Sequence, residues 1–245
     1  MRMNTDALVL RVTDIGESDR VITLLSGEYG IIRAFANGAK KLKSSRQSAT
    51  QTLCYSRFSI YKSRDSYIID DATCIESFFR LRSDIEKLSL AQYFCELENE
   101  LAPEMDDASE YLKLILNCLH MLVTGKRSQE FLKAVMELRI MTLSGYMPDL
   151  TQCSVCNAAP TGAVKFIPAS GCISCPECSA TGLSITAGVL NAMRHICLAP
   201  ANKLFSFEMP PDSLRQLCRV SEKYLISQSG RNYKALDFYN RLFRQ

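Results

Sequence analysis

Two pairs of cysteines are the residues whose type and spacing most clearly predict chemistry. Cys153-Ser-Val-Cys156 is followed, after a spacer of 18 residues, by Cys175-Pro-Glu-Cys178. Two residues between cysteines allow a tight knuckle that brings both sulfurs to one tetrahedron, and a spacer of this length returns the chain to the same ion. The pattern predicts a four-cysteine zinc knuckle over about residues 150–182, with one structural Zn²⁺ per chain. Four thiolates would leave no open position for a catalytic water.

Other interpretations of these cysteines stay open. Cys172-Ile-Ser-Cys175 competes as the second knuckle, although the turn-forming proline favours Cys175 with Cys178. Paired cysteines also occur in thiol oxidoreductases, but the strand-to-helix setting of a thioredoxin is missing here. Buried thiols without any metal are a further alternative. The remaining cysteines lie in apolar stretches and are expected to be small core residues: Cys54, Cys74, Cys95, Cys118, Cys197 and Cys218.

The sequence offers no motif for catalysis or for a membrane. Its two histidines, His120 and His195, both fall in predicted helices, and no P-loop, dinucleotide fingerprint, nucleophile elbow or zinc-protease motif occurs. The apolar stretch at the start is broken by Arg11 and is too short for a signal peptide. We therefore expect a non-enzymatic protein of a reducing cytoplasm, with no small-molecule substrate and no membrane partner.

The first eighty residues have the pattern of a small β-barrel. Short apolar runs separated by turn residues predict five strands: Ala7 to Val12, Arg20 to Leu25, Ile31 to Ala36, Leu53 to Tyr61, and one that begins at Tyr67 to Ile69. Five short strands in this length favour a closed barrel of the oligonucleotide-binding (OB) type over a sandwich. We assign this barrel to residues 1–80.

Helical periodicity replaces strand alternation after residue 80. Helices are expected at about 83–101, 109–123, 128–144, 184–198 and 212–227, with the zinc knuckle inserted between the third and the fourth. Ser83 and Glu86 have the spacing of a capping box at the first helix. The predicted fold class is thus α+β, with an N-terminal five-stranded OB-type barrel followed by an all-α domain, residues 81–245, that carries the knuckle.

The charged residues are sorted by segment. No Asp or Glu occurs between Tyr29 and Arg64, where the basic residues are Arg33, Lys40, Lys41, Lys43, Arg46, Arg57, Lys62 and Arg64. Cations without nearby anions release counterions from phosphates and so favour nucleic acid, and outward aromatic residues among them could stack on bases. The alternative is a solvated basic loop. The following segment, residues 84–110, is strongly acidic and is expected to be a solvated helix face.

The sequence also resembles a known family. Four stretches and the two cysteine pairs are similar to the bacterial RecO family of recombination mediators. The stretches are Leu8 through Gly-Glu-Ser-Asp to Arg20, Leu24 to Gly30, Ala36-Asn-Gly-Ala-Lys-Lys41, and Tyr93 to Leu97. The order of barrel, helices, knuckle and helices matches as well, so the resemblance covers nearly the whole chain. The family's knuckle has two glycines before its second cysteine pair, whereas Ser170-Gly171 stands here and Cys172 is additional.

The resemblance implies a function in the RecF pathway of DNA repair. Such proteins bind and anneal single- and double-stranded DNA, engage the single-strand-binding protein SSB, and act with RecR to load RecA. The implied DNA-contacting residues are Arg33, Lys40, Lys41, Lys43 and Arg46, and the acid-free segment adds Arg57. The implied location is the bacterial cytoplasm, at the nucleoid. The alternative function is a zinc-stabilised scaffold whose acidic helix and zinc module bind proteins, without direct nucleic-acid binding.

Overall fold

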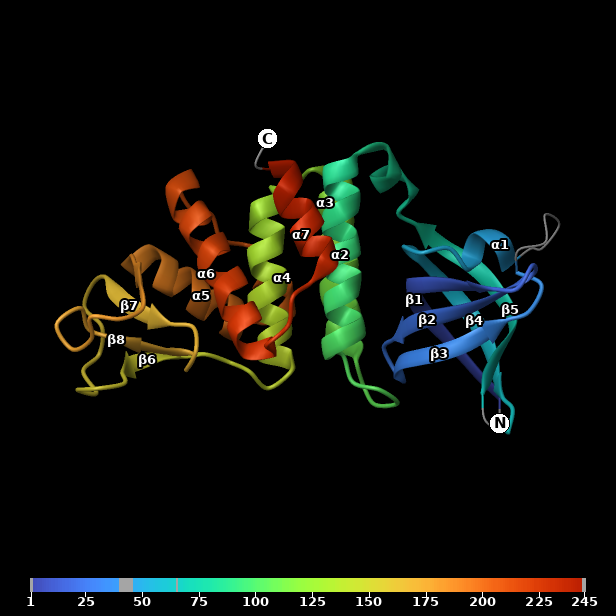
Figure 1. Ribbon diagram of the computed structural model, residues 1–245, viewed down its shortest axis with the longest axis horizontal. Coiled ribbons are helices and arrows are strands. Elements are labelled where there is room, and N and C mark those ends of the chain that lie inside the picture. The colour runs from blue at the N-terminus through green and yellow to red at the C-terminus, as the bar shows by residue number, and fades with distance from the viewer. Residues whose placement is uncertain (1, 40–45, 65, 244–245) are drawn as a thin grey trace. The chain divides into compact units, whose positions relative to one another are not determined.

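The computed structural model describes residues 2–39, 46–64 and 66–243, which form an α+β fold (Figure 1). The chain divides into two compact units. One comprises Met1–Gly125 together with Tyr233–Gln245, and the other comprises Lys126–Asn232. The chain therefore leaves the first unit, forms the second, and returns to the first for its last helix.

The first unit begins with a closed barrel. Its strands are β1 (Arg2–Ile15), β2 (Asp19–Ser26), β3 (Gly30–Ala36), β4 (Cys54–Lys62) and β5 (Tyr67–Ser77), with the short helix α1 (Arg46–Ala49) between β3 and β4. The strand order is β1-β2-β3-β5-β4, and β4 pairs with β1 to close the ring. Only β3 and β5 pair in parallel; the other neighbours are antiparallel. The predicted five-stranded OB-type barrel is confirmed.

Alternation of side chains builds the barrel core. Along β4, Cys54, Phe58 and Ile60 are buried in the interior, whereas Arg57 and Tyr61 are exposed. The interior is filled by buried, mostly apolar side chains from all five strands. On β3 the outward residues Arg33 and Phe35 are exposed, whereas β1 is buried on both faces over Ala7–Leu10 and β2 over Ile22–Ser26.

A glycine fixes how the barrel meets the next segment of its own unit. Gly30 has φ +60°, and a Cβ there would lie 2.1 Å from the carbonyl oxygen of Pro103. The next residue, Ile31, donates its N–H to the same oxygen at 2.8 Å. Only glycine allows this approach, so the loop around Pro103 is held against the start of β3.

The helices of the first unit are the 3₁₀ helix η1 (Phe79–Ser83), α2 (Ile85–Leu101), α3 (Ser109–Thr124) and α7 (Lys234–Phe243). The capping box predicted for Ser83 and Glu86 is wrong. Ser83 belongs to η1, where its hydroxyl donates to the Arg80 carbonyl at 2.8 Å. The extended residue that begins α2 is Asp84, whose carboxylate accepts the Lys87 N–H at 3.1 Å. The N-cap is thus one residue later than expected.

The last helix of the chain, α7, is an element that the sequence analysis missed. It packs along α2 in Figure 1. The Glu96 carboxylate of α2 accepts the N–H groups of Lys234 and Ala235, at 3.3 and 3.0 Å, and so satisfies amides at the start of α7. The rings of Tyr93 and Tyr233 meet edge to face at 5.8 Å. A ten-residue helix is marginal alone, so these contacts stabilise it.

The second unit combines helices with a small sheet. Its elements are α4 (Gln129–Leu143), β6 (Asp149–Cys153), β7 (Val164–Ile167), β8 (Cys172–Ser174), β9 (Leu183–Ile185), α5 (Ala187–Leu198), the 3₁₀ helix η2 (Ala201–Lys203) and α6 (Pro211–Ser229). We expected only a zinc knuckle in the segment that contains the four strands. The strands instead form a four-stranded sheet in the order β6-β8-β7-β9. Glycines with positive φ follow two of the helices: Gly145 lies just beyond α4 and Gly230 just beyond α6.

A buried charge cluster joins α4 to α6. Lys133 is 1% exposed; its Nζ lies 2.8 Å from Glu137 and 2.7 Å from Glu222, and Glu137 is fully buried. Glu137 also accepts the Ser221 hydroxyl at 2.5 Å. Burial lowers the pKa of Lys133, but the attraction of Glu137, then of Cys218 and Glu222, outweighs it and leaves that pKa raised. The lysine therefore stays charged inside the unit.

Among the described residues, no helix is both long and apolar enough to cross a membrane.

Candidate metal centre and nucleic-acid interface

The four cysteines of the predicted knuckle come from the ends of two paired strands. Cys153 is the last residue of β6 and Cys175 directly follows β8, and these two strands lie side by side. Turns after each strand then bring Cys156 and Cys178 back. In the first turn, Asn157 adopts φ +59° and donates its N–H to the Cys153 carbonyl at 2.9 Å. Each C-x₂-C pair is thus placed by one strand end and one tight turn.

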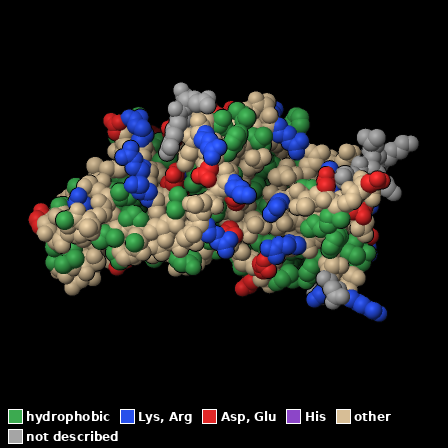
Figure 2. Space-filling model, in the orientation of Figure 1, with side chains coloured by type: hydrophobic (Ala, Val, Ile, Leu, Met, Phe, Trp, Pro, Cys, Tyr) green, Lys and Arg blue, Asp and Glu red, His purple; other side chains and the backbone are tan. Residues whose placement is uncertain are grey.

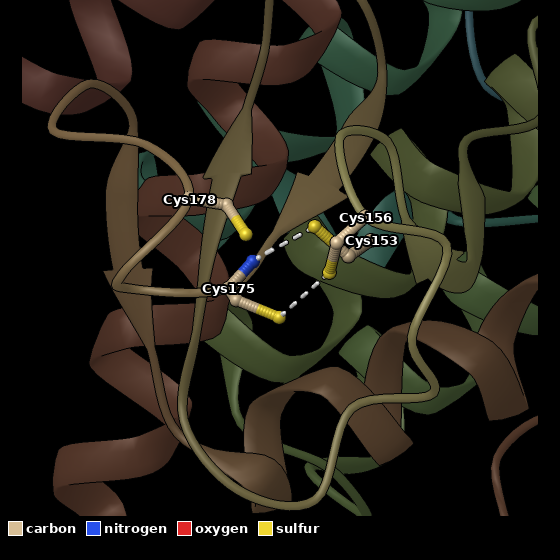
Figure 3. Close-up of side chains that lie close together, drawn as sticks. All are labelled: Cys153, Cys156, Cys175 and Cys178. Atoms are coloured by element: carbon tan, nitrogen blue, oxygen red, sulfur yellow. Dashed lines mark hydrogen bonds between the residues drawn. The ribbon is translucent and has the colours of Figure 1, made fainter.

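The four sulfurs converge on one point. All lie within 4.8 Å of one another, and Figure 3 shows the side chains directed toward a common centre. Cys156 Sγ and Cys175 Sγ are 3.8 Å apart, which is the edge length of a tetrahedron with metal–sulfur bonds of about 2.3 Å. The arrangement can hold a metal ion and is compatible with zinc, whose preferred structural ligands are four thiolates.

Backbone amides stabilise the ionised form of one cysteine of this centre. The N–H groups of Cys156, Cys175 and Val155 are directed at Cys153 Sγ and lower the pKa of that thiol to about 6; the Cys175 N–H bond is 3.3 Å long. The neighbouring sulfurs have the opposite effect on their partners. Hydrogen bonds to Cys153 and Cys156 raise the pKa of Cys175 to about 11. A cation at the centre would favour the ionised form of all four sulfurs.

Cys172, the alternative ligand, lies outside the cluster. Its Sγ is 3.4 Å from the Ser170 carbonyl oxygen. The four sulfurs that converge belong to Cys153, Cys156, Cys175 and Cys178. The geometry therefore favours Cys175 with Cys178 as the second pair. The expectation that the remaining cysteines are core residues holds for Cys54, Cys95, Cys118 and Cys197 but is wrong for Cys74, which is exposed on β5.

The predicted DNA-contacting residues are only partly within the described structure. Lys40, Lys41 and Lys43 lie outside the described residues. Arg33 projects from β3 and is exposed, with Phe35 exposed two residues further on the same face. Arg46, in the first turn of α1, donates to the carbonyls of residues 69 and 70 at 3.2 and 3.3 Å, so it connects α1 to β5.

Two of the arginines have carboxylate partners that the acid-free interval did not reveal. Arg33 lies 2.8 Å from Glu104, in the loop between α2 and α3, and both side chains are more than half exposed. Arg57 makes two bonds to Asp6 of the neighbouring strand β1, at 2.8 and 2.9 Å, and the hydrogen bond from Arg57 lowers the pKa of Asp6. Strand pairing and loop packing bring in these anions from outside the interval.

The acidic segment is less solvated than expected. Glu96 holds the start of α7, and Glu98 is completely buried in α2. Neither carboxyl oxygen of Glu98 has a hydrogen-bond partner among the described residues. Burial raises the pKa of Glu98 well above its ordinary value of 4.5. The segment therefore presents less negative charge to solvent than its composition indicates.

The fold and the site define a class: an α+β protein that joins an OB-type barrel to a helical part with a four-cysteine centre. Residues 1–78 match the family model "Recombination protein O N terminal", and residues 82–237 match "Recombination protein O C terminal". The chain belongs to the RecO family of DNA repair proteins, and this membership gives it a role in DNA repair and recombination.

Full-length relatives agree with this assignment. The chain is 34% identical to the DNA repair protein RecO of Acetivibrio thermocellus, over 99% of this chain and 98% of the relative. It is 27% identical to RecO of Symbiobacterium thermophilum, over 98% and 97% of the two chains. It is 30% identical to RecO of Pelotomaculum thermopropionicum, over 96% and 93%. The aligned region therefore spans nearly the whole chain, including both units.

Proposed function

We propose that this protein is a non-enzymatic recombination mediator. It binds and anneals DNA, acts on single strands covered by SSB, and works with RecR to help load RecA, in the bacterial cytoplasm at the nucleoid. The observation that carries the proposal is the match to the RecO family over both parts of the chain, combined with an OB-type barrel in the first part. Barrels of this type bind strands of nucleic acid on their outer face.

The outer face of β3 has the side chains that such binding uses. Arg33 and Phe35 project side by side, so a phosphate and a neighbouring base could be held together. The exposed Arg33–Glu104 pair does not prevent this, because exposed ion pairs contribute only about 0–1 kcal/mol and a polyanion can displace the carboxylate. Arg46 has a positioning role, since it holds α1 against β5 next to the lysine-rich segment.

The assignment of residues to DNA is part of the proposal. Lys40, Lys41 and Lys43 supply the charge that follows β3, and Arg57 adds to it when DNA competes with Asp6. We further propose one structural Zn²⁺ at the four cysteines. It connects the ends of β6 and β8 and so stabilises the small sheet, with no open coordination position for chemistry.

The decisive experiment is annealing of complementary strands that have first been covered with SSB. With the protein present, duplex formation is expected to be faster than in its absence. Titration of labelled single-stranded DNA at several salt concentrations should give a steep negative slope of log K against log salt. A flat slope together with unaccelerated annealing would reject the mediator and favour the scaffold.

The loop variant Lys40→Gln/Lys41→Gln/Lys43→Gln makes the test specific. Each phosphate contact on a single strand contributes about 0.7 to the slope, so loss of three should make it shallower by roughly 2. The matched control is Lys113→Gln/Lys126→Gln/Lys203→Gln, which removes the same charge from three exposed lysines elsewhere. Equal effects of both triple variants would contradict a specific role of the loop.

A further inference from the structure

One face of α6 carries a row of cations. Arg215, Arg219 and Lys223 are all exposed and are spaced four residues apart. Figure 2 shows a column of Lys and Arg side chains at the place that α6 occupies in Figure 1. With a rise of 1.5 Å per residue, neighbouring members are about 6 Å apart along the helix axis. These three residues are called the α6 stripe below.

The packing of α6 fixes the direction of the stripe. Leu217, Val220 and Tyr224 are buried on the opposite face of the helix. The Tyr224 hydroxyl donates to the Tyr146 carbonyl oxygen at 2.7 Å, which resists rotation about the helix axis. The α6 stripe is therefore held toward solvent by the core of its own unit.

The charge of the α6 stripe is mostly unbalanced. Arg215 pairs with the exposed Asp212 one turn earlier. Arg219 and Lys223 have no ion-pair or hydrogen-bond partner among the described residues. The other acid of the helix, Glu222, is 2.7 Å from the buried Lys133 and compensates that charge instead. Surface helices usually pair such cations with acids three or four residues away, and here those acids are missing or engaged.

The residue types on the exposed face of α6 indicate whether its partner is a nucleic acid or a protein. Phosphate contacts need only Lys and Arg, whereas protein interfaces have an apolar centre. None of the large hydrophobic residues that the structure leaves exposed lies on α6. A spacing of about 6 Å is of the same order as the axial advance over two nucleotides of a B-form strand, at about 3.4 Å per nucleotide. We propose that the α6 stripe is a second phosphate-binding surface, for the backbone of a nucleic acid strand.

This inference rests on the proposed function and extends it. The proposed DNA-contacting residues of the barrel belong to the first unit, and the α6 stripe belongs to the second. One chain would then hold two strands at once, one on each unit. Holding both strands raises their effective concentration for pairing, which is a physical route to annealing that needs no chemical step.

The first test compares two variants of equal charge. The stripe variant is Arg215→Gln/Arg219→Gln/Lys223→Gln, and the control is Lys113→Gln/Lys126→Gln/Lys203→Gln. Glutamine is a good helix former, so α6 should persist; circular dichroism checks that the stripe variant is folded. The salt slope for DNA should become shallower by roughly 2 to 3 in the stripe variant and change much less in the control.

The second test measures bridging. One strand is fixed to beads, the protein is bound, and capture of a second, non-complementary labelled strand is counted. The stripe variant should still bind the fixed strand but capture at least about tenfold less of the second.

The outcomes separate the two proposals. If the unmodified protein binds no DNA, the proposed function fails. If it binds and bridges, and the stripe variant behaves like the control, only the present inference is overturned, and the α6 stripe would serve an acidic protein surface.

Discussion

Glu98 provides the sharpest prediction about stability. Its side chain is fully buried in α2, and neither of its carboxyl oxygens has a partner in the described structure. Burial raises its pKa well above 4.5, so the folded protein keeps a proton that the unfolded chain releases. Unfolding is then favoured by rising pH. The stability that depends on this group is complete below about pH 4.5 and decreases as pH rises toward the folded-state pKa.

The magnitude follows from linkage. Each pH unit between the ordinary pKa of 4.5 and the raised folded-state pKa should cost about 1.4 kcal/mol of stability. Glu98→Met has a similar volume, keeps helix propensity and has no charge to bury. Its stability relative to the unmodified protein should therefore rise with pH by this amount, apart from a pH-independent packing change of less than about 1.5 kcal/mol.

The assay is urea unfolding of both proteins at a series of pH values, with hydrogen exchange of the α2 amides as a local measurement. Groups that titrate in both proteins, including the four cysteines, cancel in the difference between them. As pH rises above 4.5, an infrared band of a protonated carboxylic acid should persist in the unmodified protein and be absent from Glu98→Met. Parallel stability curves for the two proteins would refute the reasoning, since Glu98 would then ionise equally in both states.

Three other predictions concern the metal centre, the buried lysine and the barrel. Cys156→Ser should reduce bound zinc from about one per chain to near zero by elemental analysis, because it removes one of four ligands, whereas Cys172→Ser should keep it; zinc loss in both would contradict the ligand set. Lys133→Met should destabilise the second unit by about 3–5 kcal/mol in denaturant unfolding, because Glu137 is left buried without its partner; a neutral effect would mean that the glutamate is protonated or hydrated. Glu104→Gln should steepen the salt slope for single-stranded DNA by about 0.7, because it frees the arginine on β3, with a stability change below about 1 kcal/mol. An unchanged slope would remove that arginine from the DNA surface.

Structural features that depend on residues close together in the sequence were predictable. The sequence alternates along β4, and every second residue, including Phe58 and Ile60, lies inside the barrel. Glycines marked the ends of α4 and α6 because these positions require positive φ. The four cysteines were predictable because each C-x₂-C pair is closed by a local turn, so the spacing largely determines the geometry.

Features that depend on distant residues were not predictable. Asp84 replaces Ser83 as the N-cap because η1 extends through Ser83, and η1 is positioned by the barrel and helices that follow. The helix α7 begins where Glu96, far away in the sequence, accepts its first amides. The small sheet around the cysteines needs β8 to pair with both β6 and β7, and such short strands carry little pattern of their own.

Charge shows most clearly why sequence order is a poor guide to a surface. The interval without acids acquires Asp6 and Glu104 through folding, while the acidic helix loses Glu98 to the core. The α6 stripe is hidden in the sequence because Asp212 and Glu222 lie among its cations, yet Glu222 is directed at Lys133. A phosphate backbone has to displace carboxylates to reach Arg33 or Arg57, but nothing among the described residues competes for Arg219 or Lys223. DNA that binds at these two residues of α6 would therefore displace only counterions.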